Sequence, residues 1–207
     1  MANNFVNGFA SIVTAGENYQ SVGSATGNHT GPQLVYRANK DYNDTEAAGG
    51  TGVNSILVEL DASNTGTASI SLTAFITDKT SEQSCSVVSA SDVATVTKSG
   101  HGLQTGQYVF VFGSTTAYVN GFYKITRTGA NTFTYQQNAA AADANPAAGT
   151  VKYANAYSIV KDVTIPVSST LKIVSGQKIV LNANDRVYAY ASAAHCDVIA
   201  GILQEVG

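Results

Sequence analysis

Histidine is the side chain best suited to acid–base or metal chemistry at neutral pH, and this chain has three. His101 lies between two glycines, and no Cys, Asp or Glu stands near it to complete a ligand pair or a proton relay. We therefore expect a turn histidine that bonds to nearby backbone. His195, Cys196 and Asp197 are consecutive, but neighbouring strand residues point to opposite faces, so His195 and Cys196 cannot easily hold one metal ion.

The carboxylates do not define a site either. Asp41, Asp44 and Glu46 share one polar segment, but it lacks the alternating oxygen ligands around a fixed Gly that a calcium loop requires, which favours a solvated loop. The other carboxylates are scattered, which leaves a glycosidase-type acid pair open without pointing to one. No nucleophile elbow, phosphate-binding glycine loop or zinc spacing occurs. We predict no catalytic residue, metal or cofactor, and we expect that the protein is not an enzyme.

The composition limits the partners. Only 12% of the residues are charged, the formal net charge is -3, and there is no Lys/Arg cluster, which argues against nucleic acid and membrane as primary partners. The first residues lack the basic and apolar regions of a signal peptide, and no apolar run approaches the roughly 20 residues of a membrane helix. We expect synthesis in the cytoplasm without export. In that compartment Cys85 and Cys196 are expected to be free thiols rather than the one possible disulfide.

The sequence predicts that the elements that would position any site are strands, and this prediction is clearest in residues 157–206. Alternation is explicit in 186–191, where Val187, Ala189 and Ala191 fall on one side and two tyrosines on the other. The run 197–205 is apolar on both faces, as a strand covered on both sides would be. We interpret this stretch as the closing half of an antiparallel β-sandwich.

Two earlier runs show the same period. Residues 54–60 place Ile56, Val58 and Leu60 on one face, and residues 69–77 place Ile70, Leu72, Ala74 and Ile76 on one face. The turn cluster at 61–67 predicts that these runs are antiparallel neighbours. Shorter strands are expected at 9–14 and 34–37, and helical signals are missing. The Ala-rich segment 138–149 offers at most one helical turn.

The middle of the chain reads as an insertion. Residues 75–78 and 157–162 would form a hairpin if the block between them were removed, and that block has strands of its own at 93–97, 107–112, 122–127 and 132–136. A turn is expected at 129–131, and Asn120-Gly121 is the strongest short signal for a two-residue hairpin turn. We predict a jelly-roll-like antiparallel β-sandwich from residues 1–79 and 155–207, and a small inserted β-domain at 80–154. Residues 1–30, rich in Gly, Asn, Ser and Thr, are expected to be an extended arm laid on a neighbouring subunit, and a mobile tail is the alternative.

Two stretches also resemble known families. Residues 157–171 (YSIVKDVTIPVSSTL), with Gly176, 178–181, 185–187 and 191–192, resemble small virion structural proteins of tailed bacteriophages, over about a quarter of the chain. Residues 94–97, 101–103, 105–106, 120–125 and 131–135 are similar to a β-module that recurs in phage tail, fibre and head proteins, over about a third. The loop before Asn120 departs from the usual form of that module. These resemblances imply a virion component, made in the host cytoplasm.

Tyrosine stands out, with 11 residues, and suits both protein contacts and plain strand filling, so both interpretations remain open. The candidate interface residues are Phe5, Phe9, Tyr19, Tyr36, Tyr42, Tyr118 and Tyr123. The predicted function is a capsid decoration or cement protein that binds the phage major capsid protein or other virion proteins, as a homo-oligomer expected to be a trimer. The alternatives are a head-fibre or tail-fibre module that recognises a host glycan or receptor, and a neck or tail structural component.

Overall fold

A computed structural model describes residues 4–12, 31–39, 51–114, 119–137 and 151–205. Within these ranges the regular structure is β-strand apart from one 3-10 turn, η1 (Lys79–Ser81). The predicted all-β antiparallel sandwich is thereby confirmed. The chain divides into two compact units, which we call the sandwich (residues 1–15, 33–79 and 158–207) and the barrel (residues 16–32 and 80–157).

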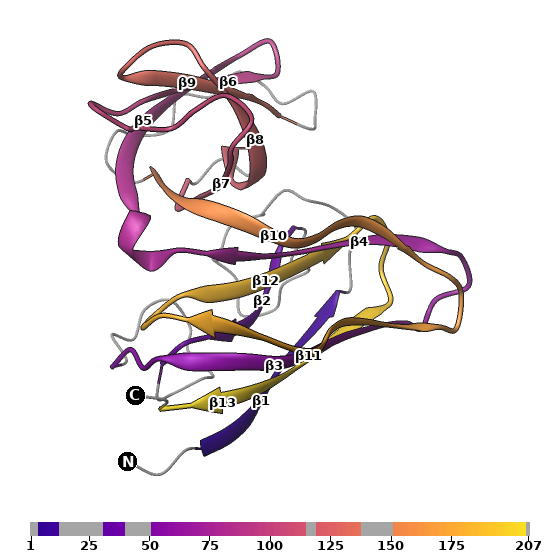
Figure 1. The fold of residues 1–207 in the computed structure, drawn as a ribbon. Helices are drawn as coiled ribbons and strands as arrows, with labels where there is room; N and C mark the ends of the chain where they lie inside the picture. The colour runs from indigo at the N-terminus through magenta and orange to yellow at the C-terminus, as the bar shows by residue number, and fades with distance from the viewer. Residues whose placement is uncertain (1–3, 13–30, 40–50, 115–118, 138–150, 206–207) are drawn as a thin grey trace. The chain divides into compact units, whose positions relative to one another are not determined.

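The sandwich consists of two antiparallel sheets (Figure 1). Sheet A has the strand order β1-β13-β3-β11, and sheet B the order β2-β12-β4-β10, with the part of β10 from residue 158 on. The neighbouring pair β4 and β10 matches the two arms of the predicted interrupted hairpin. The strands are β1 (Asn4–Ile12), β2 (Gln33–Arg37), β3 (Ser55–Asn64), β4 (Ile70–Thr77), β10 (Val151–Ile165), β11 (Thr170–Leu181), β12 (Arg186–Ala191) and β13 (Cys196–Gln204).

Alternation in the sequence correctly predicted the core faces of sheet B. Val187, Ala189 and Ala191 of β12 are buried in the sandwich core, together with Ile70, Leu72 and Ala74 of β4, and Ile76 packs against them. On the opposite face of the sheet, the rings of Tyr188 and Phe75 stack with centroids 5.5 Å apart. The two faces of β12 therefore have different surroundings, as expected.

The predicted face of β3 is wrong because the strand carries a β-bulge. Against β13 the register steps from the pair Gly201 and Glu59 to the pair Ile202 and Leu57, which leaves Val58 as the extra residue. Beyond a bulge every side chain changes face. Leu57, Leu60 and Ala62 consequently enter the core, while Ile56 and Val58 are only partly buried.

The predicted pairing of β3 with β4 is also wrong, because the two strands belong to different sheets. The chain leaves β3 at Asn64, whose side chain is 2% exposed. Its amide Nδ2 donates to the carbonyl oxygens of Ala68 (2.8 Å), Ile165 (3.1 Å) and Pro166 (3.1 Å), and its Oδ1 accepts from Gly66 N–H (2.9 Å). The turn residues thus make a crossing between sheets rather than a hairpin.

Residues 4–12 are not an arm but a strand of the sandwich. All nine pair with β13 in continuous register, from Asn4 opposite Gln204 to Ile12 opposite Cys196, and Ile12 is buried in the core. Gly8 allows this placement, since a Cβ there would stand 2.4 Å from the backbone oxygen of Val35. The rest of the predicted arm, residues 13–30, lies outside the described residues.

The barrel is a closed ring of antiparallel strands. Its order is β5-β6-β9-β8-β7, and the first residues of β10 pair with both β5 and β7 and close the ring. The core includes Val96, Val109, Ile125, Phe133 and Tyr153. The strands β6, β7, β8 and β9 lie within one residue of the ranges expected from the sequence. The bounds are β5 (Gln83–Ala90), β6 (Val93–Thr97), β7 (Tyr108–Phe112), β8 (Gly121–Arg127) and β9 (Thr132–Gln136).

The connections of the barrel follow the sequence in one case and depart from it in another. The turn expected at 129–131 is present, with Thr128 and Gly129 N–H both donating to the Thr132 carbonyl. Asn120 does not form a two-residue turn, because β7 ends at Phe112 and a longer connection follows. Its buried side chain closes that connection by accepting from Ser114 N–H (2.8 Å) and donating to the Ser114 carbonyl (2.7 Å). The segment 138–149 lies outside the described residues.

Candidate interaction surface

The outer face of sheet A carries a row of apolar side chains that runs across four strands. Cross-strand register places Phe5 opposite Leu203, Leu203 opposite Ile56, and Ile56 opposite Val180. Residues directly opposite each other in an antiparallel sheet lie on the same face. Phe5 is 74% exposed and Val180 67% exposed, while Leu203 and Ile56 are partly exposed. This row, from β1 to β11, is the apolar row.

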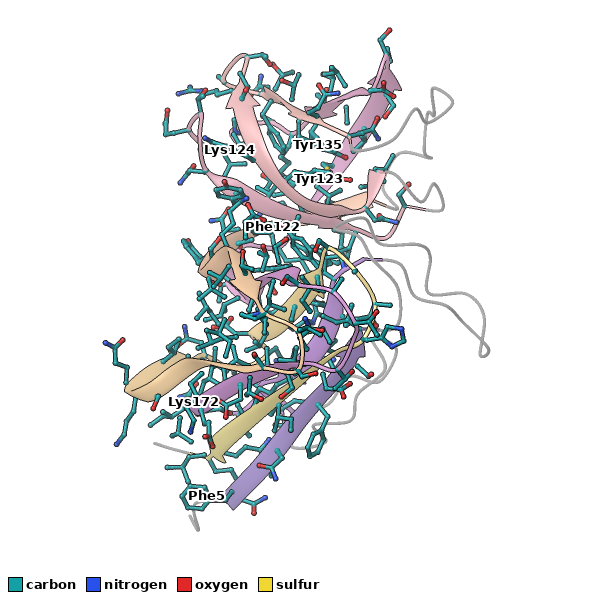
Figure 2. All side chains as sticks on the ribbon, turned by 90° about the vertical axis from the view of Figure 1, so that its right-hand side faces the viewer. Phe5, Phe122, Tyr123, Lys124, Tyr135 and Lys172 are labelled. Carbon is teal, nitrogen blue, oxygen red and sulfur yellow. The ribbon has the colours of Figure 1, made fainter. Side chains whose placement is uncertain are left out.

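A second row on the same face is apolar at one end and charged at the other. Phe9 (64% exposed) lies opposite Ile199 (49% exposed), which lies opposite Asp61, and Asp61 lies opposite Lys172. Lys172 Nζ is 3.9 Å from the carboxylate of Glu59, and both side chains are more than half exposed, so this ion pair adds little stability. Phe5 and Lys172 can be followed in Figure 2. This second row is therefore apolar towards β1 and charged towards β11, whereas the apolar row is apolar at both ends.

This face corrects the interpretation of β13 as a strand covered on both sides. Val198, Ala200 and Ile202 are buried in the core, but Ile199 and Leu203 on the other face remain accessible. Ile56, Val180, Ile199 and Leu203 were not among the candidates from the sequence. The apolar residues on both faces of β13 were the available signal, and only the cross-strand register shows that one face is left open.

The candidate interface residues fall into three groups. Phe5 and Phe9 are exposed on β1. Tyr36 and Tyr123 are 1% and 4% exposed, so in this structure they are core residues and not surface contacts. Tyr19, Tyr42 and Tyr118 lie outside the described residues, as do the acidic residues Asp41, Asp44 and Glu46.

The two buried tyrosines have internal partners. Tyr36 Oη lies 2.9 Å from Ser55 Oγ and accepts from Gln204 Nε2 at 2.8 Å, and burial raises its pKa. The ring of Tyr123 stacks on Tyr135 with centroids 4.1 Å apart, and Figure 2 shows both rings between the strands of the barrel. Desolvation is the main cause of the raised pKa of Tyr36, and both rings are part of the protein interior.

His101 has the role expected of a turn histidine. Its Nδ1 accepts from Leu103 N–H at 3.1 Å, so its Nε2 carries the proton and donates to the Gly129 carbonyl at 3.2 Å. The ring also meets the edge of Phe133, with centroids 5.2 Å apart. Both ring nitrogens are thereby used to hold two turns of the barrel together.

Among the described residues, no three His, Cys, Asp or Glu side chains gather where they could hold a metal ion. A cavity of about 480 Å³ in the sandwich lies between β10 and β11. Half of its lining residues are apolar, and its polar groups are hydroxyls, one amide and one amine; the lining residues are Ser158, Ile159, Lys172, Ile173, Val174, Ser175, Gln177 and Ile179. None of these is a carboxylate, thiol or imidazole.

Within the described part of the chain, no helix is both long and apolar enough to span a membrane.

The two cysteines are free and buried, one in each unit. Burial raises the pKa of Cys85 to about 12 and that of Cys196 to about 11, against an ordinary value of 9.0. Because the thiolate is the reactive form, alkylation by iodoacetamide at pH 8 is expected to be slower than for an exposed thiol, by roughly a thousandfold at Cys85 and a hundredfold at Cys196. Mass spectrometry of labelled peptides checks this. In guanidinium chloride both sites should react at the ordinary rate, and rapid labelling of the folded protein would contradict the burial.

No protein-family model matches this chain, and no curated protein matches it. Among solved structures, the phage phi92 endosialidase is similar, with 23% sequence identity and a TM-score of 0.32. The match covers 36% of this chain and 12% of the endosialidase chain. A likeness of this degree assigns neither the fold nor the function, so the candidate surface rests on the residues themselves.

Proposed function

We propose that this chain is a structural component of a bacteriophage virion and, within the virion, a capsid decoration protein that binds the major capsid protein through the outer face of sheet A. The apolar row on that face is the observation that carries the proposal. Soluble proteins seldom leave large contiguous apolar patches exposed unless the patch meets a partner. The resemblance of residues 157–192 to small virion proteins of tailed phages names the kind of partner.

The outer face of sheet A carries both apolar side chains, which would give affinity, and charged side chains, which would orient the partner. Burial of exposed apolar side chains such as Phe5 and Val180 supplies the driving force, at about 25 cal/mol per Å². The charged end of the second row, with Glu59, Asp61 and Lys172, would fix the orientation of the bound partner, because complementary charges set orientation more than they add affinity. A protein that binds only the assembled shell stabilises it by mass action.

The test is binding of the purified protein to phage heads that lack it. We expect decorated heads to withstand higher temperature or stronger osmotic shock than undecorated heads. Val180→Asp places a charge in the apolar row and should weaken binding to heads by at least about tenfold, as loss of an interface anchor does. Val88→Asp is the matched control, because Val88 is 50% exposed on β5, which is a strand of the barrel and not of sheet A.

Two results would contradict the proposal. Equal affinity of the Val180→Asp and Val88→Asp variants for heads would show that the apolar row is not the contact. Binding to host cells or host glycans, with no affinity for heads, would favour the alternative of a fibre module that recognises a receptor.

A further inference from the structure

The open edges of the sandwich sheets differ in how they are protected from pairing with other chains. Exposed edge strands are normally blunted by bulges, charges, proline or short length. The edge strand β11 has two register shifts and carries Lys172 and Lys178. The edge strand β2 has five residues and meets a register shift at β12. Both edges are therefore poor templates for a further strand.

Strand β1 has none of these protections. Its nine residues, NFVNGFASI, include no charge and no proline, and its ladder with β13 is uninterrupted. Among the described strands β1 pairs only with β13. Strand β2 lies against its inner face, where Gly8 meets the backbone of Val35, and so does not occupy the free edge. An uncharged, regular edge of this length is a template for one more strand.

We propose that β1 pairs antiparallel with β1 of a second copy of this chain, about a two-fold axis at Asn7, and so joins two sheets A into one continuous sheet. In this register Phe5 lies opposite Phe9 of the other copy, and the same pair recurs on the other side of the axis. Aromatic cross-strand pairs are among the favourable ones. Because β1 carries no charge, a second copy meets no like-charge repulsion. The contact depends on the edge of β1 and not on the proposed role in the virion.

The symmetry of this contact limits the assembly to two copies. A two-fold contact uses the same surface on both partners and closes on itself, so it gives a dimer and not the trimer expected from the sequence. It also extends the exposed apolar surface, because the apolar row of one copy continues through Phe5 into Phe9 and Ile199 of the other. The contact would pair seven residues of each strand and bring four phenylalanine rings together. It would bury about 1,000 Å², which is small for a specific interface, so we expect micromolar affinity.

The test is the mass of the full chain in solution, measured by sedimentation between about 1 and 300 µM, the range in which a micromolar dimer dissociates. We expect a change from the 21.4 kDa of one chain to twice that mass. In the double variant Phe5→Lys and Phe9→Lys, lysines stand opposite each other in both pairs, and the dissociation constant should rise on the order of a hundredfold. Val180→Lys, equally exposed on the opposite edge strand, should leave the dimer unchanged.

A single cysteine tests the position of the axis. Residues opposite each other across the axis have Cα atoms about 5 Å apart, within disulfide range, so Asn7→Cys should oxidise to a covalent dimer. Ser11→Cys, exposed on the same face, would lie roughly 27 Å from its counterpart and should not. A monomer at every concentration, a mass of three chains, a dimer that the lysine pair leaves intact, or equal cross-linking of the two variants would each overturn the proposal.

Discussion

Replacing Asn64 by alanine is expected to lower the free energy of unfolding of the sandwich by about 3 kcal/mol. The substitution removes the amide that donates to the Ala68, Ile165 and Pro166 carbonyls, and the Ile165 bond is fully buried. A buried polar group that loses its partner costs about 1–3 kcal/mol, and partly buried groups cost less because water can reach them. Denaturant titration followed by circular dichroism measures the change.

Two further variants separate the lost hydrogen bonds from the change in volume. Asn64→Asp keeps the size and the acceptor for Gly66 N–H but turns a carboxylate oxygen towards the three carbonyls, so it should destabilise at least as much as alanine. Ser63→Ala, at the neighbouring position, removes only an exposed bond to Thr170 and should cost no more than about 0.5 kcal/mol. If Asn64→Asp proved as stable as the natural chain, Asn64 would not be what holds the crossing between the sheets.

Phe133→Ala is expected to lower the stability of the barrel by about 3–5 kcal/mol, the usual cost of removing a fully buried aromatic ring. Phe133 has no exposed surface, and its ring packs edge-on against His101 and Tyr153, with centroids 5.2 and 5.3 Å away. The cavity left behind opens beside both neighbours. Amide resonances of the two units, followed separately by NMR in increasing urea, measure the loss.

The NMR readout also tests whether the two units unfold independently. We expect the barrel resonances to disappear at lower urea in Phe133→Ala, while those of the sandwich keep the midpoint of the natural chain. Thr134→Ala, next to Phe133 on β9 and partly exposed, should change the free energy of unfolding of either unit by no more than about 0.5 kcal/mol. Simultaneous loss of both sets of resonances in Phe133→Ala would show a single cooperative unit and would contradict this prediction.

Local patterns in the sequence predicted those parts of the fold that depend on neighbouring residues. The strands 93–97 and 132–136 were placed to the residue, and so was the turn between β8 and β9, because short strands and turns obey local rules. The bulge at Val58 could not be placed in this way. It exists because Gly201 of β13, distant in sequence, faces Glu59 and the next residue of β13 faces Leu57. The partner strand decides which residue is skipped.

The candidate surface was predictable only in part. Phe5 and Phe9 were candidates and are exposed, but Tyr36 and Tyr123 were chosen by residue type and are buried, where their hydroxyls have partners inside the protein. Residue type alone does not say on which face of a strand a side chain lies. The apolar row became visible only through the register of four strands that are far apart in the chain.

The position of β13 between β1 and β3 has a consequence for folding during synthesis. Strands β5 to β9 pair with partners made shortly before or after them, so the barrel can close once the first residues of β10 leave the ribosome. Sheet A needs β13, the last of the described strands to be made, to link β1 to β3. At roughly 5–20 residues per second, a nascent chain would present β1 unpaired for a few seconds after the barrel is complete, whereas β3 can already pair with β11. This interval is when the sandwich strands are most exposed to misassembly and to chaperones.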